Sequence, residues 1–119
     1  MALILSSHSV FAQSTATNSV DVALQNAEQA LQAAEAAHAP TLASDAYQVA
    51  KDACQQALVL QAKRKSKEIM RYTAQCIRYA ELASNQAQYM QLKHAVEVKV
   101  SENAALRRSL LLGQSLEGQ

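Results

Sequence analysis

Small apolar residues recur through residues 39–61 at alternating steps of three and four. This spacing is a heptad pattern, by which one helix presents a continuous stripe to its neighbours. Nearly all of these positions are alanine, so neighbouring helices can approach closely. We predict a helix that ends near Ala62 and forms the middle member of a bundle. Its stripe consists of Ala43, Ala46, Ala50, Ala53, Ala57 and Leu60.

A matching stripe precedes this helix. Ser19 or Asp21 can cap the first helix, because a side-chain oxygen there accepts from the free amides of the first turn. The helix should end near His38, because Pro40 disfavours helical backbone at Ala39. Leu24 and Leu31 flank its stripe, which consists of Val20, Ala23, Ala27, Ala30, Ala34 and Ala37.

A third stripe follows Lys63–Lys67, with Ser66 as a candidate cap. No Gly or Pro separates Ala62 from Ile69, so a single helix from Pro40 to Met90 is the alternative. The stripe reads Ile69, Tyr72 or Thr73, Cys76, Tyr79 or Ala80, Ala83, Ala87 and Met90.

Beyond Met90, residues 95–100 alternate as a strand would, but a lone strand has nothing to pair with in a helical chain. We interpret them as continuing the third helix, which Gly113 then stops. The predicted fold is all-α: an antiparallel three-helix bundle at 19–90, a long, projecting, coiled-coil-like third helix with its extension at 91–112, and a disordered tail at 113–119.

The extension has no partner within the predicted bundle, so its apolar side chains favour a partner helix or a second copy of the chain. We expect this interaction face to contain Val96, Val100, Leu106, Leu110 and Leu111. Asn103 lies among them, and a polar Asn in a coiled-coil seam can fix the register of two helices. The alternative for Asn103 is an ordinary surface position.

The N-terminus resembles the end of a secretory signal peptide. Within residues 1–12 an apolar run is followed by Val10-Phe11-Ala12, in which Val10 and Ala12 occupy the positions that signal peptidase reads, although the usual positive charges are missing. We predict a truncated signal peptide at 1–12, a flexible lead-in at 13–18 and a periplasmic or cell-envelope location. Without a signal peptide, the alternative is cytoplasmic.

Composition restricts the function further. The 119 residues suffice for one domain, and the net charge of +1 argues against general attraction to nucleic acid or to membranes. We expect no nucleic-acid partner and at most peripheral membrane contact. No residue spacing indicates a catalytic, metal or cofactor site, so we predict that the protein is not an enzyme and needs no cofactor.

Two groups of residues carry other candidate chemistry. If the second and third helices are antiparallel, Cys54 and Cys76 lie at the same level and can form a disulfide; two buried thiols are the alternative. The basic residues near 63–71 can hold anionic lipid or another polyanion, or can form a solvated turn. This anion patch consists of Lys63, Arg64, Lys65, Lys67 and Arg71.

The segment Ala39-Pro40-x-x-Ala43-x-Asp45-Ala46-Tyr47, followed by Ala-spaced helices, resembles a bacterial domain family of unknown function. The likeness covers residues 20–88. That family occurs in small Ala-rich envelope proteins, some of them lipoproteins and some with an OmpA-like domain after the bundle. This chain shows neither the lipobox cysteine nor an OmpA-like domain. The resemblance implies a three-helix envelope module and supplies no activity.

These features predict a non-enzymatic module of the cell envelope that presents helix faces to a protein partner or to itself. A polyanion-binding module acting through the basic residues is one alternative. A small all-helical exported enzyme is the other, and it would need charged side chains facing the interior.

Overall fold

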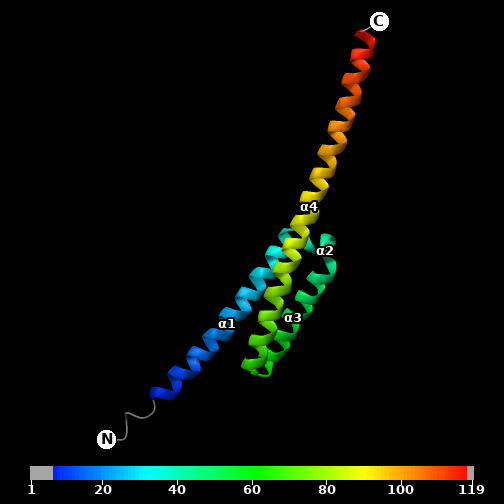
Figure 1. Ribbon diagram of the computed structural model, residues 1–119. Coiled ribbons are helices and arrows are strands. Elements are labelled where there is room, and N and C mark those ends of the chain that lie inside the picture. Colours follow the sequence, from blue (N-terminus) through cyan, green and yellow to red (C-terminus); the bar gives the residue numbers. More distant parts are fainter. Residues whose placement is uncertain (1–6, 118–119) are drawn as a thin grey trace, which may run out of the picture. The chain divides into compact units, whose positions relative to one another are not determined.

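The computed structural model describes residues 7–117, and the side chains of residues 19–114. Within residues 7–117 the chain forms helices and no strand, which confirms the all-α fold class (Figure 1). The chain divides into two compact units, Met1–Ala87 and Gln88–Gln119. The helices are α1 (Ser7–Ala36), α2 (Ala39–Leu42), α3 (Ser44–Ala62) and α4 (Ser66–Glu117), of which α4 runs through both units.

The first unit is a bundle in which α1, α3 and the first part of α4 lie side by side (Figure 1). Its buried residues form successive layers. Val20, Leu60 and Ile69 pack together at one end, and Ala27, Ala53 and Cys76 form the middle layer. Residue numbers therefore rise along α1 and α4 and fall along α3, which is the antiparallel arrangement predicted.

All six predicted stripe positions of the middle helix are buried, five of them in α3 and Ala43 just before it, which confirms that stripe. In α1, Val20, Ala27 and Ala34 are buried, and the stripe positions between them are half-buried. On α4 the structure selects Thr73 over Tyr72 and Ala80 over Tyr79 as the buried members. The Thr73 hydroxyl donates to the Met70 carbonyl oxygen at 3.0 Å, so its burial leaves no unpaired donor.

The turns fall close to the predicted places. His38 has left-handed backbone, with φ 63°, and follows the end of α1; Arg64 has φ 57° in the turn between α3 and α4. Lys63, Arg64 and Lys65 lie outside both helices, so the alternative of one helix from Pro40 to Met90 is wrong.

The expected continuous middle helix is interrupted at Ala43, whose φ of −143° and ψ of 52° are not helical. The helical hydrogen-bond spacing nevertheless continues across the bend. The Ala43 N–H donates to the carbonyl oxygen of Ala39, and the Tyr47 N–H donates to that of Ala43. The bend lets α2 cover one end of the bundle: Ala39 is fully buried in the same cluster as Ala34 and Ala87. Burial of Ala39 is the physical reason we assign to this difference.

Both outer helix boundaries also differ from the predictions. The backbone of α1 begins at Ser7, so the expected flexible lead-in at 13–18 is helical. No Gly or Pro interrupts this stretch, and a helix already packed from Val20 onward can extend backwards without a new nucleus. Of the expected signal peptide at 1–12, residues 1–6 lie outside the described residues.

At the other end, α4 continues through Gly113 to Glu117, so residues 113–117 of the expected disordered tail are helical. A lone Gly within a helix costs only about 1 kcal/mol, and Gly113 does not adopt the positive φ that ends helices. Residues 118–119 lie outside the described range.

The second unit consists of α4 from Gln88 onward, and its described side chains, those of residues 88–114, are all exposed. Met90 is 41% exposed, so the bundle stripe ends at Ala87 rather than at Met90. The alternating residues Val96, Val98 and Val100 are helical, as predicted.

Matched substitutions on α1 test the alanine packing. Ala34 is fully buried, whereas its neighbour Ala33 is exposed. We expect Ala34→Leu to lower the free energy of unfolding by about 1–3 kcal/mol, because the larger side chain must push two helices apart. Ala33→Leu should change it by less than ~0.5 kcal/mol. Urea unfolding of both variants measures this, and equal effects would contradict tight packing at Ala34.

Candidate functional site

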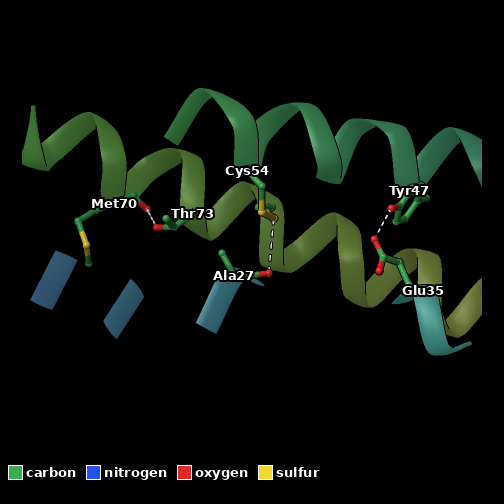
Figure 2. Close-up of a disulfide and its surroundings, with 7 residues drawn as sticks. Ala27, Glu35, Tyr47, Cys54, Met70 and Thr73 are labelled. Atoms are coloured by element: carbon green, nitrogen blue, oxygen red, sulfur yellow. Dashed lines mark hydrogen bonds between the residues drawn. A yellow bond between two sulfur atoms is a disulfide. The ribbon is translucent and has the colours of Figure 1, made fainter. Parts of the chain in front are cut away.

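A disulfide joins Cys54 of α3 to Cys76 of α4, with the two Cα atoms 5.3 Å apart (Figure 2). This is the cysteine pair that the antiparallel arrangement predicted. It lies in the middle layer of the bundle, beside Ala53 and against Ala27 of α1. The link closes a loop with a sequence separation of 22 residues, which contains the whole turn between α3 and α4.

The third helix of the bundle contacts this disulfide directly. The sulfur of Cys76 lies 3.8 Å from the carbonyl oxygen of Ala27 on α1, the contact marked in Figure 2. A disulfide sulfur carries no proton, so in the oxidised protein this is a packing contact. On reduction, the Cys76 thiol would have a carbonyl acceptor in place. Cys76 is fully buried, whereas Cys54 is half-buried.

Cys54 also lines a solvent-open groove of about 540 Å³ between α1 and α3. The groove is apolar along Leu24, Leu31 and Leu58, and it is bordered by Asp21, Glu28, Lys51 and three glutamines. The spacing of the three stripes does not predict this groove. The sequence feature that could have indicated the groove is the pair Leu24 and Leu31, which flank the first stripe and are larger than its alanines. Both are half-buried in the structure.

Tyr47 forms a second cross-helix contact at the α2 end of the bundle. Its ring is buried, and its hydroxyl donates to Glu35 Oε1 of α1 at 2.7 Å (Figure 2). This hydrogen bond, together with burial and the negative charge of Glu35, raises the pKa of Tyr47 above its ordinary value of 10.0. The four tyrosines therefore differ: Tyr47 is a packed, hydrogen-bonded residue, whereas Tyr89 is exposed.

The predicted anion patch is brought together around the turn between α3 and α4. All of its members, Lys63, Arg64, Lys65, Lys67 and Arg71, are exposed. The guanidinium of Arg71 lies 5.1 Å from the centre of the Tyr72 ring on the same helix, a cation–π distance. The anion patch is thus an exposed surface in which the Arg71 guanidinium lies over the Tyr72 ring.

The predicted interaction face lies entirely on the second unit. Its five residues, Val96, Val100, Leu106, Leu110 and Leu111, are each more than half exposed. Leu92 and Leu112 add to the exposed apolar surface of this unit. Singly exposed apolar side chains are ordinary on folded proteins, whereas large contiguous apolar patches are typical of interaction surfaces.

Two further findings concern the described residues. They contain no group of three or more His, Cys, Asp or Glu side chains that could hold a metal ion. Among the described helices, none has both the length and the hydropathy to cross a membrane.

Comparisons with models of known protein families, with curated proteins and with solved structures found no match. The resemblance to the Ala-rich envelope domain family therefore stays a prediction, and the site has to be interpreted from its own geometry.

The disulfide predicts a redox-dependent stability. Reduction should lower the free energy of unfolding by ~3 kcal/mol, because a loop of this length is no longer closed in the unfolded chain. Urea unfolding with and without dithiothreitol measures the difference. The double variant Cys54→Ala/Cys76→Ala is the control, and its stability should not respond to the reductant. If reductant leaves the wild-type midpoint unchanged, the linkage does not stabilise the bundle.

The Tyr47–Glu35 hydrogen bond predicts a stability that falls at alkaline pH. Because folding raises the pKa of Tyr47, the folded chain holds the phenol proton more tightly. The stabilisation is complete below pH ~10 and is lost as pH rises through the folded pKa. Wild type should exceed Tyr47→Phe by about 1 kcal/mol at neutral pH, with the gap shrinking above pH ~10.

The control for this measurement is Tyr89→Phe, since Tyr89 is exposed. Its stability should follow that of wild type across the same pH range in urea unfolding. A gap between wild type and Tyr47→Phe that stays constant through the alkaline range would argue against the hydrogen bond.

Proposed function

We propose that this protein is a non-enzymatic structural module whose second unit binds another polypeptide chain through its exposed apolar residues. The bundle of α1, α3 and the first part of α4 acts as the folded base of this module. The observation that carries the proposal is the contrast within α4. Its stripe positions from Ile69 to Ala87 are buried in the bundle, whereas the apolar side chains of residues 88–114 are all exposed.

The bundle interior supports a structural role. The buried positions in the described part of the chain hold apolar residues together with Thr73, and no charged side chain. The described buried side-chain polar atoms all have hydrogen-bond partners. A small helical enzyme, the least favoured alternative, would need charged groups converging inside, and the described interior offers methyl groups instead.

We also propose that the protein is located in the oxidising cell envelope, and the disulfide supports this location. Stable disulfides are typical of exported proteins and rare in the cytosol. Cys54 and Cys76 are each other's partner, and the bond closes a loop in a bundle with a thin interior. We propose export to the periplasm on this ground, together with the signal-like residues 1–12.

Polyanion binding through the anion patch is the second candidate function. The clustering of five exposed cations around one turn favours it. Lys63, Arg64 and Lys65 follow the carboxyl end of α3 and complement its dipole, so their position has a structural explanation as well. The exposed apolar residues of the second unit have no such structural explanation, and we therefore place association first.

Site-specific photo-crosslinking in native cells tests the proposed function. A photoreactive amino acid at Leu106, which is 59% exposed on the second unit, should yield a covalent polypeptide adduct. The control is the same residue at Val59, which is 52% exposed on α3 of the bundle. The adduct mass reports whether the partner is this chain or another. Equal adduct yields at both positions, or none at Leu106, would contradict the proposal.

A further inference from the structure

The apolar residues of the second unit follow a heptad register of their own. Continued past Ala87, the bundle stripe would pass through Met90, His94, Glu97 and Ser101, which are mostly polar. Moving the register forward by two residues gives a different series with the same alternating steps of three and four, and five of its seven positions are apolar. This seam, which spans three heptads, consists of Tyr89, Leu92, Val96, Lys99, Asn103, Leu106 and Leu110.

We infer that the occupant of this seam is the same seam of a second copy, in a parallel, in-register, two-stranded coiled coil. The inference rests on the proposed function and names its partner. Tyr89, Val96, Asn103 and Leu110 occupy the a positions of the heptad, and Leu92, Lys99 and Leu106 occupy the d positions. A β-branched residue at a and leucine at d, as at Val96 and Leu92, favour two strands.

The charges beside the seam select the parallel orientation. Glu102 occupies a g position, and Arg107 occupies the e position five residues later. In a parallel pair, the g residue of one chain meets the e residue of the following heptad on the other. Glu102 of each copy therefore meets Arg107 of the other copy, which makes two symmetric ion pairs.

An antiparallel pair would lose these contacts. There, e residues meet e residues and g residues meet g residues. The two cations at e positions, Lys93 and Arg107, would face each other or neutral residues, and Glu102 would meet no cation from the partner. Charge complementarity within the seam thus distinguishes the two orientations.

The polar seam residues fit the same arrangement. Asn103 at an a position can pair with its copy, a feature that fixes the register and the two-stranded state at some cost in stability. Lys99 at a d position can extend its ammonium group to water. Lys99 Nζ already lies 3.4 Å from Glu102 Oε2 on the same helix, so Glu102 can balance Lys99 and the partner's arginine together.

Sedimentation velocity of the full oxidised chain over about 1–500 µM provides the first test, with a reversible monomer–dimer equilibrium as the expected result. Glu102→Arg and Arg107→Glu should each raise the dimer dissociation constant about tenfold, and the two changes combined should restore most of the affinity. The matched controls are Glu97→Arg and Arg108→Glu, at b and f positions outside the seam, which should leave it unchanged. Asn103→Val should lower the dimer dissociation constant, because it removes the cost in stability of a polar residue in the seam.

Crosslinking measures the orientation. The described cysteines are both in the disulfide, so a short bismaleimide reacts only with a cysteine introduced by mutation. In the parallel dimer, Val96→Cys chains crosslink to each other, and so do Leu110→Cys chains. Crosslinks that form only when the two variants are mixed indicate an antiparallel pair and overturn the inference.

A chain that stays monomeric at every concentration also overturns the inference. The photo-crosslinking result at Leu106 then determines whether the proposed function still holds. An adduct with a different polypeptide would support the proposed function and identify that polypeptide as the partner in place of a second copy. No adduct would contradict both proposals.

Discussion

The bundle depends on how closely its helices approach one another, and methyl groups set that distance. Ala27, Ala34, Ala50, Ala57 and Ala83 are at most 2% exposed, so backbones pack almost directly against each other. Such packing is specific, because nothing larger than a methyl group fits, but each alanine removes little apolar surface from water. Larger buried side chains, Leu60, Ile69 and Tyr47, are placed toward the two ends of the bundle.

This thin interior explains why the cross-helix bonds lie where they do. Among the described residues, the buried members of the middle layer are Ala27, Ala53 and Cys76, and this layer contains the disulfide. A covalent link there disfavours the unfolded chain without requiring more volume between the helices. The Tyr47–Glu35 hydrogen bond similarly holds α1 to α3 near the end where α2 packs. The disulfide and the hydrogen bond each link helices that alanine contacts alone would hold together weakly.

Much of this fold could be predicted because heptad spacing is a local property of the sequence. The stripe of the middle helix followed from it. The antiparallel helices placed Cys54 and Cys76 at one level, where a disulfide and two buried thiols were both open. The bend at Ala43 could not be predicted, since no Gly or Pro marks it and its reason is burial of Ala39 against distant residues. The Tyr47–Glu35 contact was missed for a related reason: its partners lie 12 residues apart across a turn whose geometry depends on the left-handed backbone of His38.

The helix boundaries were predicted less well for a different reason: a residue that can end a helix does not always do so. Gly113 was expected to end α4, yet a glycine ends a helix only when its backbone turns left-handed, and here it does not. The same consideration bears on residues 88–114. A long polar helix with no buried face gains little from packing, so its apolar residues have no role in stabilising it alone. We therefore propose that their arrangement in a second heptad register, with Glu102 and Arg107 beside the seam, serves a contact outside the single chain.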